Sequence, residues 1–199
     1  MARRSDHTRE ELYRMTLDAA RDILREQGLA ALTARSLAAR IGYSPGTLYN
    51  LFRNLDDLIV HLNGETLDAL REVLDGVPED GDIETRLWNF ARAYIGFTVD
   101  NRELWNVLFE HRLPEGIDVP DWYRDKLAGL LARVEAALTE VVPDDAVARG
   151  RATRVLWSGL HGLCTLSQLG KLGLIAEDGV EDLARDLIRR YLDGLVGAR

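Results

Sequence analysis

The string Gly42-Tyr43-Ser44-Pro45-Gly46 has the spacing G-x-S-x-G, in which the serine hydroxyl of a hydrolase acts as the nucleophile. This chemistry needs a strand before the serine, and Asp and His partners further along the chain. Residues 37–41, however, have helical periodicity. Pro45 also removes a backbone N–H that usually helps to bind the oxyanion. The sequence therefore predicts that the protein is not an enzyme and has no catalytic residue.

The histidines and the cysteine offer no better site. The chain has His7, His61, His111 and His161, and no two of them have the i, i+4 spacing of a metal-binding pair on one helix. The single cysteine, Cys164, cannot form a disulfide within the chain and is expected to be a buried, inert thiol. We expect no metal and no cofactor.

The residues around Ser44 fit a turn between two short helices better than they fit an active site. Thr33 can begin a helix that ends before Gly42, and the glycine allows the tight turn that follows. Ser44 can cap a second helix, in which Pro45 takes its favoured first position and which runs to about Phe52. This arrangement matches the helix–turn–helix pattern, whose second helix enters the major groove of DNA.

The outward residues of the second helix have the chemistry to contact DNA. Thr47 can touch a base edge or a thymine methyl, Asn50 can bond a base or a phosphate, and Tyr49 offers a hydroxyl to the DNA backbone. The free N–H groups at the helix N-terminus can bind a phosphate. The predicted contacts on this helix are Ser44, Pro45, Gly46, Thr47, Tyr49 and Asn50.

Helical periodicity dominates the rest of the chain, and no stretch alternates as a strand would. Thr8 and Glu11 form a capping box that begins the first helix, and Gly28 ends it. Further helices are expected at about 33–41, 45–52, 56–75, 82–100, 102–111, 121–142, 144–173 and 178–196. We therefore predict an all-α protein of about nine helices, with a three-helix helix–turn–helix domain over residues 1–60 and a helical bundle over residues 61–199.

Residues 8–60 resemble the DNA-binding domain of the TetR family of bacterial transcriptional regulators. The matching residues are Leu32-Thr33, Leu37-Ala38, Ile41-Gly42, Ser44 through Tyr49, Phe52 and Leu58. The resemblance implies that the start of the first short helix also faces DNA, which adds Thr33 and Arg35 to the expected contacts.

Two positions that touch phosphate in this family carry other residues here. Leu51 stands where the family often has His, and Leu55 stands where it usually has Lys. Arg53, Asn54 and an N-terminal arm, Arg3-Arg4, could replace these contacts. The alternative for the arm is a solvated terminus that binds nothing.

Eight of the fourteen aromatic residues lie between residues 88 and 123, on several predicted helices. Bulky aromatic side chains on different helices can frame an apolar cavity, and the alternative is a solid aromatic core. The family resemblance favours the cavity, because such regulators usually sense a small ligand there. The candidate pocket residues are Trp88, Tyr94, Phe97, Trp105, Phe109, Trp122, Trp157, His161 and Gln168.

A segment of the second predicted domain also resembles the TetR family. Residues 157–162 are similar to the Trp…His-Gly signature of the WHG class of C-terminal domains in the TetR family. Within this segment His161 either binds the ligand or holds a neighbouring helix by a hydrogen bond. Gln168 is polar on an apolar helix and needs a hydrogen-bond partner.

The last two predicted helices carry apolar residues beyond one core face. On the last helix Leu183, Leu187, Tyr191 and Leu195 form one stripe, which Ala184, Ile188 and Leu192 widen. The resemblance implies that the last two helices of two chains make a four-helix dimer interface. A homodimer also suits a two-fold symmetric operator.

Charge and composition restrict the partners. The net charge is −8, but residues 1–64 hold nine arginines and eight acidic residues, a balance of +1, so residues 65–199 carry −9. A polyanion would therefore meet the first third of the chain. No apolar run is long enough to span a membrane, and the first residues lack the apolar core of a signal peptide, so we expect a cytoplasmic protein without a membrane partner.

Together these patterns predict a ligand-responsive transcriptional regulator that binds double-stranded operator DNA as a homodimer. We expect a repressor that a small apolar or aromatic effector releases. The alternative is a helical protein–protein interaction module without operator binding, which the acidic second domain would favour.

Overall fold

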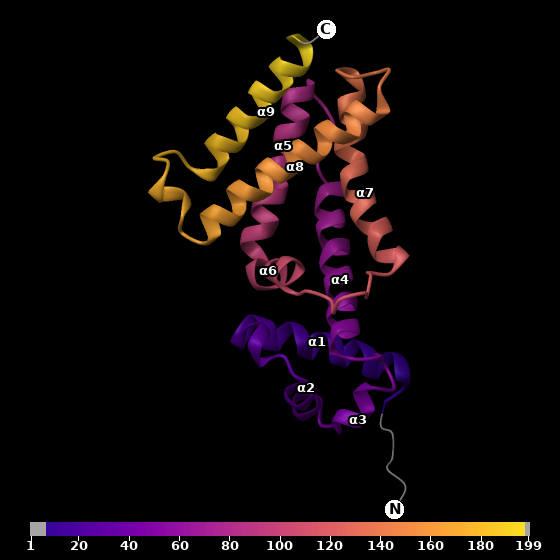
Figure 1. Cartoon of the computed structure of the whole chain (residues 1–199). Coiled ribbons are helices and arrows are strands. Elements are labelled where there is room, and N and C mark those ends of the chain that lie inside the picture. Colours follow the sequence, from indigo (N-terminus) through magenta and orange to yellow (C-terminus); the bar gives the residue numbers. More distant parts are fainter. Residues whose placement is uncertain (1–6, 198–199) are drawn as a thin grey trace, which may run out of the picture. The chain divides into compact units, whose positions relative to one another are not determined.

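The computed structural model describes residues 7–197, and over that range it has nine α-helices and no strand (Figure 1). The predicted all-α fold is confirmed. The helices are α1 (Arg9–Gln27), α2 (Ala34–Ile41), α3 (Pro45–Leu48), α4 (Leu55–Asp75), α5 (Ile83–Asp100), α6 (Arg102–Glu110), α7 (Asp121–Ala137), α8 (Ala146–Gln168) and α9 (Val180–Gly197). Short 3-10 helices occupy Leu29–Ala31, Leu138–Glu140 and Leu172–Leu174.

The chain folds into two compact units. The N-terminal unit contains the residues up to 67 together with 103–123, and the C-terminal unit contains 68–102 and the residues from 124 onward. The boundaries therefore fall inside α4 and α7, which continue without a break. A division at residue 60 therefore differs from the way the chain packs, because residues 103–123 belong to the N-terminal unit. As a division of roles between DNA binding and sensing, the predicted boundary stays a prediction.

One apolar cluster explains why residues 103–123 pack with the N-terminal unit. It joins side chains of α1, α2, α3 and α4, and two side chains of α6 belong to it as well. Burial of this kind of surface contributes roughly 25 cal/mol per Å². Its members include Leu17, Ile23, Leu24, Leu37, Leu48, Phe52, Leu58, Leu62, Leu104 and Val107.

In the C-terminal unit α8 packs against α9, and α5 packs against both. Their shared core includes Leu87 of α5, Leu156 of α8 and Ile188 of α9. Gly159 allows a close approach between α8 and α9, because a Cβ added there would lie only 2.7 Å from Cδ2 of Leu187. Leu187 therefore contributes to packing within the chain.

The predicted start of α1 is confirmed. Glu11 N donates to Thr8 Oγ1 at 3.2 Å, and Thr8 N donates to Glu11 Oε2 at 2.6 Å, so both halves of the capping box are present. The backbone hydrogen bond from Thr8 holds the pKa of the Glu11 carboxyl below its usual value. Gly28 ends the helix with a φ of 76°.

Three helices end earlier than predicted: α3 at Leu48 instead of residue 52, α7 at Ala137 instead of 142, and α8 at Gln168 instead of 173. For α8 the reason is Gly170, whose φ of 66° is left-handed. Gly170 N then donates to Ser167 O at 2.9 Å, and Lys171 N donates to Leu166 O at 2.8 Å. These bonds satisfy the last carbonyls of the helix and turn the chain away from its axis.

Candidate functional site

The turn between α2 and α3 is fixed by contacts at both ends of α2. Ser36 N donates to Thr33 Oγ1 at 3.0 Å, which caps the start of the helix. At its other end Gly42 is left-handed, with φ 76° and ψ 24°, and Tyr43 N donates to Ala38 O at 2.9 Å. Because both ends of α2 are capped, the chain enters α3 in a defined direction.

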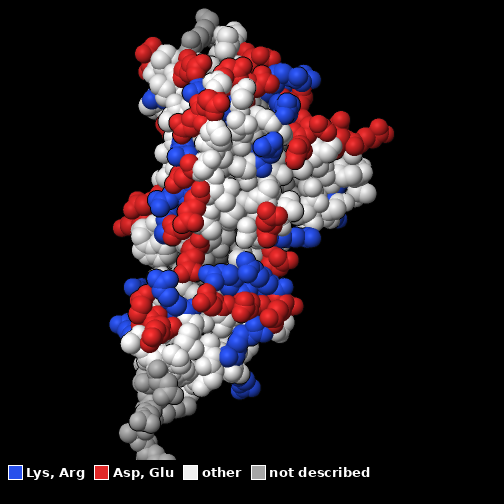
Figure 2. All heavy atoms as spheres, turned by 180° about the vertical axis from the view of Figure 1, so that it is seen from behind, with Lys and Arg blue, Asp and Glu red and all other residues white. Residues whose placement is uncertain are grey.

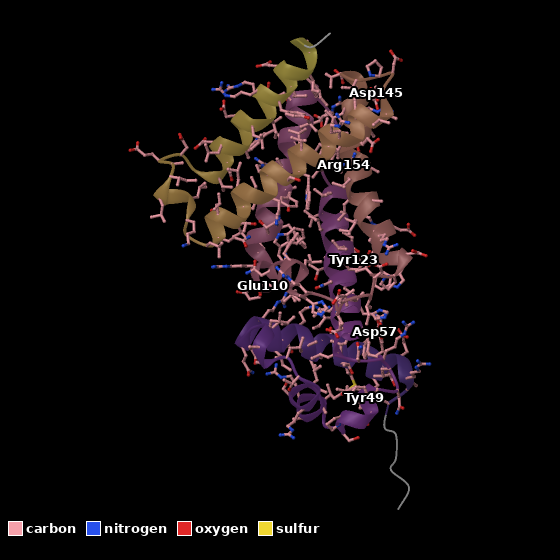
Figure 3. The ribbon with its side chains drawn as sticks, in the orientation of Figure 1. Tyr49, Asp57, Glu110, Tyr123, Asp145 and Arg154 are labelled. Carbon is pink, nitrogen blue, oxygen red and sulfur yellow. The ribbon has the colours of Figure 1, made fainter. Side chains whose placement is uncertain are left out.

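The predicted DNA contacts around this turn are mostly on the surface. Tyr49 is 58% exposed, whereas the adjacent Leu48 is 4% exposed and belongs to the core (Figure 3). The helix pair therefore buries one face and leaves its polar face to solvent. The other exposed residues of the predicted set are Thr33, Arg35, Pro45, Gly46, Asn50, Arg53 and Asn54.

Ser44 and Thr47 are half-buried, and they contact each other. The prediction that the Ser44 side chain caps α3 is wrong, because its hydroxyl makes no cap bond and lies 3.1 Å from Thr47 Oγ1. Instead, Thr47 N donates to the backbone oxygen of Ser44 at 2.9 Å. Pairing of the hydroxyls restricts the rotamers of both side chains at the proposed recognition surface.

Asn54 has a structural task that the sequence analysis missed. Asp57 N donates to Asn54 Oδ1 at 2.8 Å, so Asn54 caps the start of α4. In return, Arg53 N donates to Asp57 Oδ2 at 2.9 Å. The spacing Asn-x-x-Asp is a recognisable start signal, and the Asp57 label in Figure 3 marks its second member.

The arm residues Arg3 and Arg4 lie outside the described residues. His7, the first residue described, is hydrogen-bonded through Nδ1 to the hydroxyl of Tyr43 at 2.7 Å. Tyr43 is part of the turn between α2 and α3, so the described chain begins beside the helix–turn–helix.

Charged side chains of both signs lie on the surface, with uncharged areas between them (Figure 2). On the face shown in Figure 2, acidic and basic side chains are interspersed, and no uniformly basic surface is visible from this side. Several arginines are engaged by acids, as in the pairs of Arg40 with Glu26 and of Arg21 with Glu65. Binding of a polyanion would therefore depend on where particular arginines lie, since the net charge does not favour it.

The nine candidate pocket residues do not all fall in one unit. Trp105, Phe109 and Trp122 belong to the N-terminal unit, where the rings of Trp105 and Phe109 are 5.4 Å apart. The other six belong to the C-terminal unit: Trp88, Tyr94, Phe97, Trp157, His161 and Gln168. The aromatic segment that is continuous in sequence is thus divided between two packing units.

Within the C-terminal unit, Tyr94 and His161 form a buried polar pair. The Tyr94 hydroxyl is 3.0 Å from His161 Nδ1, and Tyr94 is only 4% exposed. The His161 ring stacks on Trp157 at 5.4 Å with an interplanar angle of 13°. Burial raises the pKa of Tyr94 far above its usual value and lowers the pKa of His161. Both groups are therefore neutral near pH 7.

Two other residues of α8 that the sequence singles out, Gln168 and Cys164, have defined surroundings. Gln168 Nε2 donates to Thr98 O at 2.9 Å, which supplies the partner that this residue was predicted to need. Cys164 is 3% exposed, and desolvation raises the pKa of its thiol to about 11, so it is the buried, unreactive cysteine that was expected. Trp88 is covered by Arg185, whose guanidinium lies 4.4 Å from the ring centroid.

Two histidines of the N-terminal unit take part in contacts that sequence reasoning missed. The His61 ring stacks on Trp122 at 5.2 Å, and its Nδ1 is 3.1 Å from the Tyr13 hydroxyl. His111 Nε2 lies 2.8 Å from Asp56 Oδ1. These partners are far apart in sequence, so no local pattern could have paired them.

Within residues 7–197, no three His, Cys, Asp or Glu side chains come together in a group that could hold a metal ion. None of the helices described is both long enough and apolar enough to cross a membrane.

Two family models match the sequence. Residues 17–62 match the model of "Bacterial regulatory proteins, tetR family". Residues 87–191, more than half of the chain, match "Tetracyclin repressor-like, C-terminal domain". No curated protein matches the sequence closely enough to count as a relative.

Solved structures share the fold over nearly the whole chain. A protein of unknown function from Rhodococcus sp. RHA1 is 20% identical, with a TM-score of 0.75, over 98% of this chain and 99% of its own. The transcriptional regulator FadR from Bacillus subtilis, solved with stearoyl-CoA, is 16% identical, with a TM-score of 0.69, over 92% and 98%. The TetR family regulator PfmR from Thermus thermophilus is 18% identical, with a TM-score of 0.61, over 89% and 97%. At such identities the likeness shows a common fold.

The partial burial of His161 predicts a pH-dependent stability. The pKa of His161 is lowered in the folded chain, so the unfolded chain binds a proton more readily. The contribution of neutral His161 to the free energy of unfolding is therefore complete above the ordinary histidine pKa of about 6.5. It is lost as the pH falls below that value. We therefore expect the difference in melting temperature between the wild type and His161→Gln to be smaller at pH 5 than at pH 7.5. An equal difference at both pH values would contradict this.

Proposed function

Because this chain belongs to the tetR family of bacterial regulatory proteins, and is therefore a DNA-binding transcriptional regulator and not an enzyme, we propose that it is a homodimeric repressor that a small apolar or aromatic molecule releases from its operator. Ligand binding can do this only if the molecule has different affinities for the DNA-bound and released conformations. We also propose that the residues up to 60 bind DNA and that the rest senses the ligand and dimerises.

The observation that supports operator binding best is the division of α2 and α3 into a buried and an exposed face. Leu37 and Leu48 are each at most 4% exposed, whereas Tyr49 projects 58% of its surface to solvent. We assign base contacts to Thr47 and Asn50 and a phosphate contact to Tyr49. The remaining proposed contacts, mainly to phosphate, are Arg3, Arg4, Thr33, Arg35, Ser44, Pro45, Gly46, Arg53 and Asn54.

Substitutions of Tyr49 and Asn50 test this assignment with a duplex selected from a random pool. Tyr49→Ala should weaken the selected and a random duplex alike, by at least about tenfold, because a phosphate contact carries no sequence information. Asn50→Ala should weaken only the selected duplex, because a base contact is lost. Gel-shift titrations measure both.

Val73→Ala is the matched control, since Val73 is 42% exposed on α4 and lies outside the proposed surface. If the Tyr49 and Asn50 variants both bind like the control, the surface formed by α3 and the residues directly after it is not the recognition surface. If no duplex is selected at all but a protein partner is bound, the protein is an interaction module.

Dimerisation is proposed through α8 and α9. Exposed or partly exposed residues recur along α8 at spacings of three and four, which is the pattern of a helix that packs against a partner helix. Val155 is 44% exposed and Leu169 is 62% exposed at the two ends of this stripe, and smaller residues lie between them. The stripe is Val155, Ser158, Gly162, Thr165 and Leu169. The second part of the proposed interface is the stripe predicted on α9 (Leu183, Leu187, Tyr191, Leu195), whose members are partly exposed.

Val155→Glu tests the dimer better than a change at Leu187, because Leu187 also packs on Gly159 within the chain. Two glutamates that face each other in an apolar interface bury unpaired like charge, at a cost of several kcal/mol. We expect a helical monomer in light scattering that no longer binds the operator. Val73→Glu, on an exposed part of α4, should remain dimeric. A dimeric Val155→Glu protein would place the interface elsewhere.

The effector class is supported by the aromatic residues and the buried Tyr94–His161 pair of the C-terminal unit. The FadR structure with stearoyl-CoA shows that a protein of this fold can bind a thioester that carries a long apolar acyl chain. We therefore propose a ligand that is mainly apolar and carries a polar atom that could bond with the pair.

A melting screen of fatty acyl-CoA thioesters and aromatic acids, with stearoyl-CoA as the first probe, tests this. A true effector at 100 times its dissociation constant should stabilise the protein by about 2.7 kcal/mol, and it should weaken operator binding because coupling is reciprocal. Tyr94→Phe should reduce the shift, and Val147→Ala, at a 71% exposed site on α8, should not. A screen without any shift would favour a solid core.

A further inference from the structure

The recognition helix α3 is too short to hold its own shape. It has four residues, Pro45–Leu48, which form a single turn. Isolated helices of fewer than about 12–15 residues are marginal in water. The position of α3 therefore depends on what anchors the chain at either end. At the N-terminal end the anchor is the turn at Gly42, and at the C-terminal end it is Phe52.

Phe52 is held in an aromatic cluster beneath α3. It is 3% exposed and stacks on Tyr13 of α1 at 5.1 Å, with an interplanar angle of 24°. Its edge contact with the His61 ring is 5.8 Å between centroids. Phe52 N donates to Leu48 O at 2.9 Å, so the position of Phe52 is linked by a hydrogen bond to the last residue of α3.

His61 of α4 contacts side chains of α1 and α7 and Phe52 after α3. Its Nδ1 is hydrogen-bonded to the Tyr13 hydroxyl at 3.1 Å, and its Nε2 is 3.9 Å from Asp57 Oδ1. Asp57 in turn accepts a hydrogen bond from Arg53 N, directly after Phe52. The open face of the imidazole is covered by Trp122, whose ring stacks at 5.2 Å with an interplanar angle of 27°.

Trp122 comes from a distant part of the chain. It belongs to residues 103–123, which pack in the N-terminal unit although the chain on both sides of this segment belongs to the C-terminal unit. Leu104 and Val107 attach the segment to the core, and the His111–Asp56 contact at 2.8 Å attaches it to the first turn of α4. Trp122 is the second residue of α7, which continues into the C-terminal unit.

We propose, on the basis of the recognition role proposed above for α3, that His61 is a positioning residue for DNA binding. By stacking on Trp122 while it holds Tyr13 and Phe52, it fixes the C-terminal end of α3 before DNA arrives. A recognition helix that is ordered in advance loses less conformational entropy on binding. The stack also makes the orientation of α3 dependent on Trp122 in the first turn of α7.

Hydrogen exchange in the DNA-free protein tests the positioning role without any operator. The amides of Asn50, Leu51 and Phe52 donate to the last residues of α3. In Trp122→Ala and His61→Ala they should exchange about tenfold faster than in the wild type, because an aromatic pair and its packing are lost. The amide of Leu37 in α2, which donates to Thr33 O at 3.0 Å, should be unchanged.

Two conservative variants and a control separate positioning from general damage. Trp122→Phe retains an aromatic ring and should restore the slow exchange. Tyr13→Phe removes only the hydroxyl bonded to His61, and it should speed exchange about fivefold even if the alanine variants fail to fold. Ile117→Ala removes a 52% exposed side chain from the same segment and should behave like the wild type.

Operator discrimination is the second measurement. Trp122→Ala should lower the ratio of selected-duplex to random-duplex affinity about tenfold, while Trp122→Phe should retain it, since a misplaced α3 still meets phosphates but not bases. The role is overturned if the amides after α3 exchange at the wild-type rate in Trp122→Ala and Tyr13→Phe, even when Tyr49→Ala abolishes binding. It is also overturned if Leu37 exchanges faster by the same factor. If no duplex binds, the proposed function fails, and the exchange rates still decide whether His61 positions α3.

Discussion

Burial of Leu48 and Phe52 is the interaction on which the DNA-binding half of this protein depends. The two side chains lie at the end of α3 and just beyond it, and each is at most 4% exposed. A single helical turn gains almost nothing from its own backbone bonds, so these contacts determine where Tyr49 and Asn50 point. The left-handed Gly42 completes the constraint, because it fixes the angle at which the chain leaves α2. Tyr49 and Asn50 can then stay exposed at the surface while Leu48 and Phe52 fix the backbone between them.

The same core also explains how distant segments can influence α3. Leu104 and Val107 belong to it, so residues 103–123 are a structural part of the N-terminal unit despite their place in the sequence. α4 and α7 both run from one unit into the other without a break. Each of these two helices therefore contributes side chains to both packing units.

Local chemistry in the sequence was a good guide to local structure. The capping box of Thr8 and Glu11, the turn at Gly42 and the identity of every long helix could be predicted, because each depends on residues within a few positions. The end of α3, the Ser44–Thr47 pairing and the stack of Trp122 on His61 could not, because tertiary contacts decide them. The aromatic segment from residue 88 to 123 predicts one cavity, yet its members pack in two units.

The separation into two units restricts the chemistry of the effector that we propose for the C-terminal unit. Tyr94 and His161 are both neutral and bonded to each other in surroundings formed by rings and aliphatic side chains. Breaking this bond without replacing it would lose the contribution of a typical protein hydrogen bond, about 0.5–1.5 kcal/mol. A ligand that enters here must therefore leave the pair intact or offer a donor or acceptor of its own. A site of this kind discriminates strongly against analogues that lack the polar atom, whereas it distinguishes poorly between apolar chains that differ by one methylene.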